Sequence, residues 1–291
     1  MAKLLTGKEV TDALVTDLQR RTAALEKNGV VPTLAILRVG ENPGDVSYEK
    51  GAMKRAEQVG VYVRQIILPE TADEKMLLGA VDQVNADESI HGLLLLRPLP
   101  AHLKAAQSRI CNRLDPKKDV DGMTHGSAAG VFEGLPLGFA PCTPAACMEI
   151  LDQYGIDCTG KNAVVIGRSL VVGKPAAMML LEKNATVTVC HTKTKNLPAI
   201  CKNADIIVTA AGCLNSLTED FVRPGQVVID VSVNWDENKI NAKGGKGGIA
   251  GDAVFEKIEP IVDAITPVPG GVGAVTTAVL MKHVVEAAEH G

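Results

Sequence analysis

The sequence has no run of 18 apolar residues, and its first residues do not form the apolar core of a signal peptide. It also has no excess of basic residues, because the net charge is -4 and the pI is about 5.9. The first absence argues against a membrane span and against export. The second argues against nucleic acid or an anionic membrane as a partner. We therefore expect an enzyme-like protein of the cytoplasm.

The cysteines form no Cys-x-x-Cys pair, and their number, seven, is odd. They are scattered through apolar segments at positions 111, 142, 147, 158, 190, 201 and 213. A zinc site usually needs paired spacing, and an even set of cysteines is typical of a disulfide framework. We therefore predict no metal site and no disulfides, and we interpret the cysteines as buried thiols in a reducing compartment.

Near the middle of the chain lies a predicted strand, turn and helix start. The four apolar residues 163–166 precede Gly167, Arg168 and Ser169, and Gly173 opens a run rich in alanine and methionine. Glycines let the backbone approach a ligand, and the N–H groups of a helix start attract phosphate. The Gly-x5-Gly spacing differs from the Gly-x-Gly-x-x-Gly fingerprint. We interpret the segment as a nucleotide-binding turn, the alternative being a turn that only connects strand to helix.

Three further strands are predicted after this turn, at residues 186–190, 204–212 and 226–231. Their continuous apolar runs are typical of a parallel sheet covered on both faces, which favours a Rossmann-like domain. In an NAD-binding unit the second strand usually ends in an acidic residue that binds the ribose hydroxyls. Here Thr192 follows that strand, and Arg168 stands in the first turn. The sequence therefore predicts NADP rather than NAD as the cofactor.

The first 140 residues also alternate helices with strands, but they contain no phosphate-binding turn. We predict helices at 7–28, 47–58 and 73–85, and strands at 33–40, 61–68 and 90–96. With 291 residues in the chain, two α/β domains are expected.

Several connecting segments carry signals of their own. Pro141 and Pro144 indicate a domain joint, because proline fixes the angle at which a helix is entered. Taken alone, residues 117–122 indicate a solvated turn with an aspartate cap. The lysine- and glycine-rich residues 243–248 are predicted to form a flexible surface loop, and a final helix is predicted over 275–288.

Five motifs occur in order along nearly the whole chain, and together they resemble the methylenetetrahydrofolate dehydrogenase/cyclohydrolase family. They are Asp119-Val120-Asp121-Gly122, Pro141-Cys142-Thr143-Pro144, Gly167-Arg168-Ser169-x-x-Val172-Gly173-Lys174-Pro175, Cys190-His191-Thr192 and Pro267-Val268-Pro269-Gly270-Gly271-Val272-Gly273. Each motif is weak alone, but five in register are specific. The resemblance implies that 5,10-methylenetetrahydrofolate is oxidised with NADP, and that the methenyl product is normally hydrolysed to 10-formyltetrahydrofolate.

The resemblance also implies an architecture. Residues 1–140 would form an α/β folate-binding domain, joined by the last helix at 275–291. Residues 141–274 would form the NADP-binding Rossmann domain, with a cleft between the two domains. The family is usually homodimeric, so a homodimer is expected.

The resemblance assigns roles to individual residues. Asp121 would accept hydrogen bonds from the amino-pyrimidine edge of the folate, and Tyr48 would lie against the folate near the reacting carbon bridge. The backbone of Pro269, Gly270 and Gly271 would close over the substrate. The implied cofactor-binding residues are Gly167, Arg168, Ser169, Thr192 and Val233, of which the last would touch the nicotinamide half.

Two positions depart from the family's bifunctional pattern, which has Tyr-x-x-x-Lys in the second helix and a glutamine before the Pro-Leu-Pro turn. Ala52 stands at the lysine position and Leu96 at the glutamine position, both in the implied substrate site. On a helix, Lys50 and Lys54 lie about 200° and 240° around the axis from Tyr48. Neither ammonium group is therefore expected to point with the tyrosine.

The chemistry tolerates these losses unevenly. Hydride transfer to the nicotinamide depends mainly on positioning, because the folate nitrogens stabilise the product cation. Hydrolysis needs proton transfer, for which a positioned side chain supplies about 10²–10⁴-fold. Our first hypothesis is a monofunctional dehydrogenase that leaves its product to spontaneous hydrolysis or to a separate cyclohydrolase. The alternatives are a bifunctional enzyme that uses Lys50 or Lys54, and a nucleotide-binding regulator without turnover.

Overall fold

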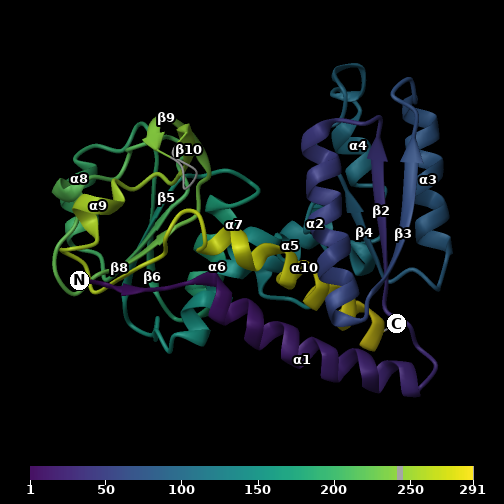
Figure 1. Cartoon of the computed structure of the whole chain (residues 1–291), viewed down its shortest axis with the longest axis horizontal. Helices are drawn as coiled ribbons and strands as arrows, with labels where there is room; N and C mark the ends of the chain where they lie inside the picture. The colour runs from purple at the N-terminus through teal and green to yellow at the C-terminus, as the bar shows by residue number, and fades with distance from the viewer. Residues whose placement is uncertain (241–244, 291) are drawn as a thin grey trace. The chain divides into compact units, whose positions relative to one another are not determined.

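The computed structural model describes residues 1–240 and 245–290, and its chain divides into two compact units (Figure 1). The six-stranded unit consists of residues 1–11 and 143–276, and the three-stranded unit consists of residues 12–142 and the segment from 277 onward. Each unit combines a parallel sheet with helices, so the predicted α/β class is confirmed. The predicted boundaries differ for residues 1–11, which they group with residues 12–140 and not with the six-stranded unit.

The six-stranded unit holds a parallel sheet in the order β1-β11-β8-β7-β5-β6. Its strands are β1 (Lys3–Leu4), β5 (Asn162–Ile166), β6 (Thr186–Cys190), β7 (Ile206–Thr209), β8 (Val227–Asp230) and β11 (Ala264–Ile265). Its helices are α6 (Cys142–Gln153), α7 (Gly173–Glu182), α8 (Leu197–Lys202) and α9 (Phe255–Ile258), with the 3-10 turn η3 (Glu219–Phe221). Val164, Ile207 and Val228 from three neighbouring strands are buried in one core, as the continuous apolar runs predicted.

The strand order of this sheet reverses beside β5. The chain runs from β5 outward to β6 and then returns to β7 on the other side of β5. In an open parallel sheet, ligands bind at the carboxyl ends of the strands that flank such a switch point. Gly167 follows β5 and Ala210 follows β7, so the predicted nucleotide-binding turn lies at the switch point.

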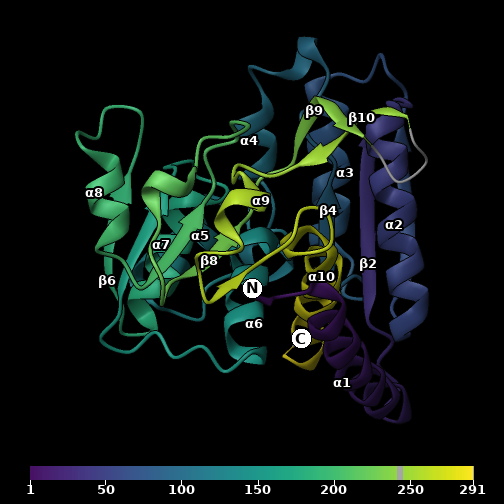
Figure 2. The ribbon, with the colours of Figure 1, turned by 60° about the vertical axis from the view of Figure 1, so that its left-hand side comes forward.

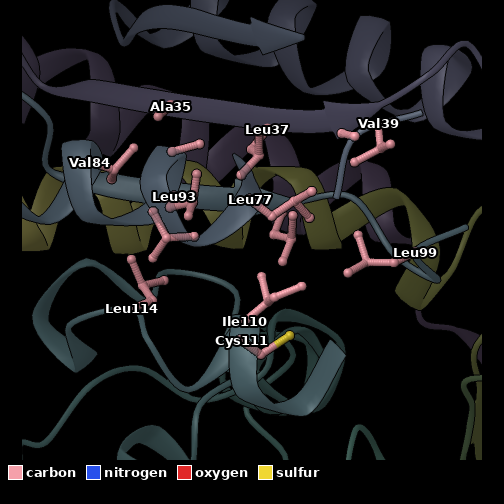
Figure 3. Packing of buried hydrophobic residues seen from close by; sticks show 14 of the residues in the cluster. Ala35, Leu37, Val39, Leu77, Val84, Leu93, Leu99, Ile110, Cys111 and Leu114 are labelled. Atoms are coloured by element: carbon pink, nitrogen blue, oxygen red, sulfur yellow. The ribbon is translucent and has the colours of Figure 1, made fainter. Parts of the chain in front are cut away.

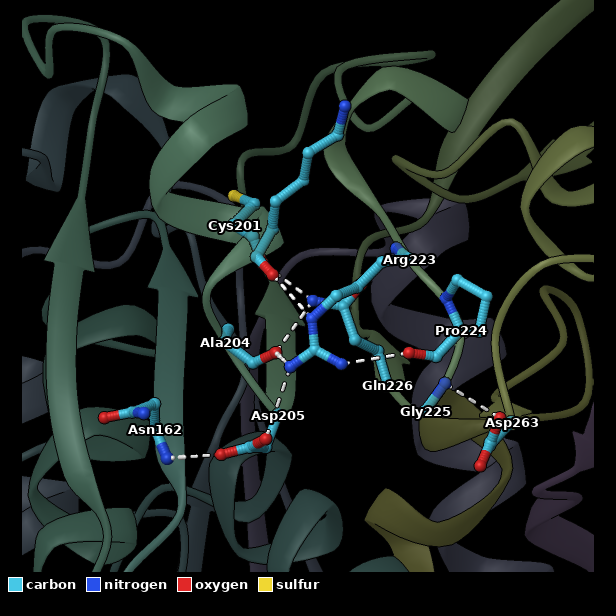
Figure 4. A network of polar contacts seen from close by, with 10 residues as sticks. Asn162, Cys201, Ala204, Asp205, Arg223, Pro224, Gly225, Gln226 and Asp263 are labelled. Carbon is cyan, nitrogen blue, oxygen red and sulfur yellow. Dashed lines mark hydrogen bonds and ion pairs between the residues drawn. The ribbon is translucent and has the colours of Figure 1, made fainter.

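The opposite, amino-terminal edge of the sheet is held by a network around Arg223 (Figure 4). The Arg223 guanidinium donates hydrogen bonds to the carbonyl oxygens of Lys202 and Ala204, at 2.7 and 2.9 Å. Gln226 donates to Ala204 as well, at 2.8 Å, and Asp205 accepts the N–H of Asn162 at 2.9 Å. The bonds use backbone groups at the end of α8, before β7 and at the first residue of β5, so this edge has a structural role.

An antiparallel pair, β9 (Asn234–Ile240) and β10 (Lys246–Ala250), extends from the six-stranded unit. The prediction of a flexible loop over 243–248 is therefore wrong for Lys246, Gly247 and Gly248, which lie in β10. Gly247 adopts φ +90°, and a Cβ atom there would come within 2.5 Å of the Trp235 ring, so glycine lets the two strands approach. Lys243 and Gly244 lie outside the described residues.

The three-stranded unit holds a parallel sheet in the order β3-β2-β4. Its strands are β2 (Thr33–Val39), β3 (Tyr62–Leu68) and β4 (Gly92–Leu95). Its helices are α2 (Pro43–Val59), α3 (Glu74–Ala86), α4 (Gln107–Cys111) and α5 (His125–Glu133), with the 3-10 turns η1 (Ala101–Leu103) and η2 (Pro116–Lys118). The long helices α1 (Gly7–Lys27) and α10 (Val272–Glu289) contribute residues to both units.

The two faces of the three-stranded sheet are covered by different helices, with α2 and α3 on opposite sides (Figures 1 and 2). Leu37 and Val39 of β2 pack in one apolar core with Leu77 of α3 and Ile110 of α4 (Figure 3). Side chains alternate along a strand, so the intervening residues face α2. In β4, Leu93 and Leu95 lie in this core, so Leu94 faces the α2 side. Leu96 follows directly after the strand.

Helix α2 begins at Pro43, four residues before the predicted start at Ser47. The Asn42 side chain accepts the backbone N–H of Gly44 at 2.8 Å, and Pro43 occupies the first helical position. Asparagine at the N-cap and proline in the first turn both favour a helix start, and our prediction overlooked them. The last helix likewise begins at Val272, three residues before the predicted start.

All seven cysteines are free thiols. Six of them are buried as predicted, but Cys213 is exposed, so the prediction is wrong at that position. Among the described residues, no helix combines the length and the apolar character needed to cross a bilayer.

Candidate functional site

A cavity of about 370 Å³ lies at the carboxyl end of β4, on the side of the sheet that carries α2. We call it the β4 pocket. It brings together Tyr48, Leu96 and Asp121, three of the predicted substrate-site residues. The complete lining is Gly44, Asp45, Tyr48, Leu94, Leu95, Leu96, Arg97 and Asp121.

Helix α2 presents Tyr48 to the β4 pocket. Ala52 lies one turn further on, on the same face, and is fully buried rather than part of the lining. Lys50 and Lys54 are exposed on other faces of α2, as the helical spacing predicted. Because α2 is continuous from Pro43 to Val59, neither lysine shares the face of Tyr48.

The surroundings of Tyr48 in the β4 pocket keep its hydroxyl group protonated. Burial of its phenol group raises the pKa of Tyr48, and the nearby Asp121 carboxylate raises it further, while Arg97 opposes the change. The residue as a whole is 39% exposed, so the ring is accessible to a ligand. Tyr48 can therefore donate a hydrogen bond and present an aromatic face, but the hydroxyl does not ionise near neutral pH.

Asp121 is presented by a turn that its neighbour Asp119 holds in place. Asp119 is fully buried and accepts the backbone N–H groups of Met123 at 2.9 Å and Thr124 at 2.7 Å. It also accepts the Ser127 hydroxyl at 2.5 Å. The solvated-turn interpretation is therefore wrong for Asp119, whose carboxylate satisfies three donors inside the unit.

The Asp121 carboxylate forms an ion pair with Arg97. Arg97 Nη2 lies 2.7 Å from Asp121 Oδ2, and the two side chains are 24% and 18% exposed. Burial raises the pKa of Asp121, and the Arg97 charge opposes that rise. Our sequence analysis missed Arg97 and Asp45. The available signal was a single arginine at the end of an apolar strand, directly before Pro98.

The predicted cofactor residues lie at the carboxyl edge of the six-stranded sheet. Ile166 pairs with Cys190, so Gly167 and His191 leave the sheet side by side, with Arg168 and Thr192 next to them. Gly167 adopts φ +127°, and a Cβ atom there would come within 2.3 Å of the Ala210 oxygen. Close packing between the turn and the neighbouring strand thus explains the glycine.

Ser169 caps the helix that follows this turn. Its hydroxyl oxygen accepts the N–H groups of Val172 at 3.1 Å and Gly173 at 3.3 Å, at the start of α7. The hydroxyl proton is left to donate to a ligand. Arg168 and Thr192 are exposed, and the described residues offer Arg168 no ion-pair partner. The turn after β5 therefore offers a guanidinium, a hydroxyl group and a helix start, a donor set that suits phosphate, and Thr192 adds a hydroxyl group after the neighbouring strand β6.

A second cavity, of about 320 Å³, lies in the six-stranded unit after β8. Val233 and the three residues Pro269, Gly270 and Gly271 all line it, so the structure joins two predicted groups. Gly270 adopts φ +102°, a conformation that favours glycine. The Val233 side chain and the glycine backbone at Gly270 and Gly271 leave room here for a planar ring of a ligand.

Asp252 organises the loops beside this cavity, and our sequence analysis missed it. It is fully buried and accepts the N–H groups of Ala211 and Cys213, at 2.7 and 2.9 Å, and the Ser232 hydroxyl at 2.7 Å. The loop after β7 and the loop after β8 are thereby tied to one carboxylate. Asp230 lies beside it, and burial raises the pKa of Asp230 to about 6.

Comparison with known families covers both units. The description "Tetrahydrofolate dehydrogenase/cyclohydrolase, catalytic domain" matches residues 5–121, and "Tetrahydrofolate dehydrogenase/cyclohydrolase, NAD(P)-binding domain" matches residues 141–291. The chain belongs to the tetrahydrofolate dehydrogenase/cyclohydrolase family. The resemblance drawn from five sequence motifs is thereby confirmed.

Curated and solved members of the tetrahydrofolate dehydrogenase/cyclohydrolase family match along their whole length. The "Bifunctional protein FolD" of Carboxydothermus hydrogenoformans is 51% identical over 99% of this chain and 98% of its own. The crystal structure of the bifunctional enzyme FolD from Campylobacter jejuni has a TM-score of 0.92 and 38% identity, covering 100% of this chain and 99% of that one. FolD from Trypanosoma brucei, described as a complex with NADP and an inhibitor, has a TM-score of 0.90 and 29% identity, with 99% and 98% covered.

Proposed function

We propose that this chain oxidises 5,10-methylenetetrahydrofolate to the methenyl form by hydride transfer to NADP, and that it does not hydrolyse the product at an enzymatic rate. One observation carries the proposal. The β4 pocket combines Tyr48 and Asp121 with Leu96, above a buried Ala52, and the lysines of α2 are exposed on other faces. The pocket therefore has groups that position a folate but lacks the amine that the family's hydrolytic step uses.

The β4 pocket would take the pterin end of the substrate. An ionised Asp121 accepts hydrogen bonds from the paired N–H donors of an amino-pyrimidine edge. The Tyr48 ring packs against the folate, and its protonated hydroxyl donates toward the reacting carbon bridge. The apolar wall at Leu94 and Leu96 excludes water from that side.

The carboxyl edge of the six-stranded sheet would hold NADP. Arg168 and the hydroxyl groups of Ser169 and Thr192 supply the charge and the donors for its phosphates, and Val233 contacts the nicotinamide half. When bound, NADP supplies the hydride acceptor. The donor set fits NADP better than NAD, because Thr192 stands near the position where NAD enzymes place an acidic residue, and Arg168 in the first turn adds a positive charge.

Dehydrogenation and hydrolysis make different demands on these side chains. Hydride transfer requires that the carbon bridge be held against the acceptor, and the folate nitrogens stabilise the cation that forms. Hydrolysis requires that water be activated and that protons move as the ring opens. An alanine and a leucine do neither, so the second reaction is left to solution or to a separate cyclohydrolase.

A bifunctional dehydrogenase/cyclohydrolase is the second candidate. The relatives at 51% and 45% identity bear the name bifunctional, which favours it. Under this candidate, Lys50 or Lys54 would have to reach the pocket from an exposed face of α2.

Two assays on the purified protein test these candidates. NADP reduction with methylenetetrahydrofolate should be rapid, and NAD should serve poorly. Loss of methenyltetrahydrofolate should proceed at the rate of the buffer alone. Hydrolysis well above that rate establishes the bifunctional candidate, and absence of NADP reduction removes both.

The remaining expectations stay predictions. They are a folate-binding role for residues 1–140 with the last helix at 275–291, an NADP-binding role for 141–274, a homodimer, and a cytoplasmic location. Sedimentation of the purified protein tests the homodimer directly.

A further inference from the structure

Arg97 is the one residue of the β4 pocket that brings a positive charge to its wall. Its Nη2 atom lies 2.7 Å from Asp121 Oδ2. Its Nε atom is buried, and none of the described residues accepts a hydrogen bond from it. A buried, unpaired N–H group lowers stability, so the arginine is poorly explained as a stabilising residue alone.

The geometry leaves Asp121 free to bind a second partner. An ionised carboxylate offers about four lone-pair positions, and Arg97 uses one of them. The remaining positions suit two N–H donors on one edge of a heterocycle. If Asp121 were protonated, it would present an O–H group to those donors and lose acceptor capacity.

The environment of Asp121 works against its ionisation. Burial raises its pKa and the negative Asp119 raises it as well, whereas the Arg97 charge and hydrogen bond lower it and the nearby Cys142 thiol lowers it further. Asp121 in turn acts on Tyr48 and Cys111, whose own pKa values are raised mainly by burial. Arg97 is the positively charged group that acts on Asp121, so it is the residue whose charge favours the ionised carboxylate.

We propose that Arg97 is a positioning residue for the folate, because it holds the Asp121 carboxylate ionised and oriented with its free lone pairs toward the pterin edge. The inference rests on the proposed function, since it assigns the pterin to Asp121. Arg97 acts through Asp121 and does not shuttle protons, because a guanidinium stays protonated under all working conditions.

The test compares wild type with Arg97→Met and Arg97→Lys, using folic acid as the probe because it carries the same amino-pyrimidine edge. Isothermal titration calorimetry gives its Kd between about pH 6 and pH 8, and steady-state assays give KM and kcat for methylenetetrahydrofolate. The ratio of variant Kd to wild-type Kd cancels the titration of the ligand. For Arg97→Met we expect this ratio to be about ten-fold or more and to be larger near pH 6 than near pH 8, because the cation that opposes the raised pKa of Asp121 is then missing. Arg97→Lys keeps the charge and should recover most of the affinity.

Two controls separate positioning from packing. Arg109→Met removes another arginine–carboxylate pair of the same unit, with Glu74, whose atoms lie 2.8 Å apart on the surface, and it should leave Kd unchanged. In an Asp121→Asn background, adding Arg97→Met should produce no further pH dependence.

The outcomes are distinct. A ratio that is flat across the pH range, whether near one or uniformly raised, overturns the role assigned to Arg97. If that result comes with normal wild-type turnover, the proposed function stands. If wild type neither binds folic acid nor reduces NADP with methylenetetrahydrofolate, both the proposed function and this inference are wrong.

Discussion

Ala52 lies one helical turn after Tyr48 on the same face of α2, and its methyl group is fully buried. The side chain one turn after Tyr48 therefore carries neither a charge nor a hydrogen-bonding group. Leu96, at the end of β4, is likewise buried and apolar. Under the proposed function, these two positions separate the reaction that needs positioning from the one that needs a proton carrier.

Restoring both polar groups should create hydrolysis. In Ala52→Lys with Leu96→Gln, a lysine placed in this buried position should have its pKa lowered by desolvation, which suits general acid–base catalysis. We expect methenyltetrahydrofolate hydrolysis to rise about 10²-fold or more over wild type, followed by the loss of its absorbance.

The matched control for this gain is Gly51→Lys, which adds the same charge to an exposed position of α2 with open space around it. It should leave hydrolysis at the rate of the buffer. Equal gains in the two variants would mean that the charge acts from any position, and the argument from the Tyr48 face would be lost.

Asp121→Asn should weaken folate binding while leaving cofactor binding intact. The amide keeps the shape but replaces one acceptor oxygen by a donor that opposes the pterin N–H groups. We expect KM for methylenetetrahydrofolate to rise about ten- to hundred-fold, as for loss of a hydrogen bond to a charged group. Asp82→Asn removes a surface carboxylate paired with Arg113 in the same unit and serves as the control. An unchanged KM in Asp121→Asn would contradict the assignment.

The site residues were predicted from the family resemblance, and local patterns added part of their geometry. The relation of Tyr48 to Ala52, Lys50 and Lys54 follows from helical periodicity, which depends on adjacent residues alone. The strand-turn-helix unit around Gly167 follows from an apolar run and glycine. In both cases the chemistry and its geometry lie within one short segment.

Pairings between distant segments were not predictable in this way. Arg97 meets Asp121 because β4 ends just before the arginine, and because Asp119 holds the turn that carries Asp121. Asp252 binds loops that follow two different strands, about 20 and 40 residues earlier in the chain. The β9–β10 pair was missed because its glycines resemble those of a loop, whereas Gly247 makes room for Trp235.

Arg168→Gln should reduce the preference for NADP. The exposed guanidinium has no ion-pair partner among the described residues, so its charge is available to a phosphate. Loss of a charge-assisted pair should raise the Kd of NADP about ten- to hundred-fold and change that of NAD by less than about three-fold. Lys161→Gln, an exposed lysine at the opposite edge of the sheet, is the control. Parallel losses for both cofactors would exclude recognition of the 2′-phosphate by Arg168.

Asp252→Ala should loosen the loops that carry Cys213 and Ser232. The substitution leaves several buried donors without an acceptor, each at a cost of about 1–3 kcal/mol. We expect a clear fall in the free energy of unfolding, and a lower kcat because the backbone near Val233 is no longer held. Urea unfolding and NADP-reduction kinetics measure the two effects. An unchanged free energy of unfolding would show that Asp252 does not stabilise these loops.

His283 should make the three-stranded unit sensitive to acid. It is buried on α10, hydrogen-bonds the Val120 carbonyl oxygen at 2.9 Å and packs beside the Phe139 ring. Burial lowers the pKa of His283 from 6.5 to about 4. The unfolded chain therefore binds a proton below about pH 6.5 that the folded chain refuses, and stability is lost as the pH falls from there toward 4.

The comparison is between wild type and His283→Gln, whose amide retains a donor for Val120. Asp230 titrates over a similar range with the opposite sign, because its raised pKa of about 6 makes the folded state bind the proton first. The difference between variant and wild type cancels that contribution. Between about pH 7 and pH 4.5, urea unfolding should show the variant gaining about 2–3 kcal/mol relative to wild type. His125→Gln, at an exposed position, should show no such gain. If the difference in stability between variant and wild type is the same at both pH values, the pKa of His283 does not change on folding. The acid sensitivity assigned to His283 is then wrong.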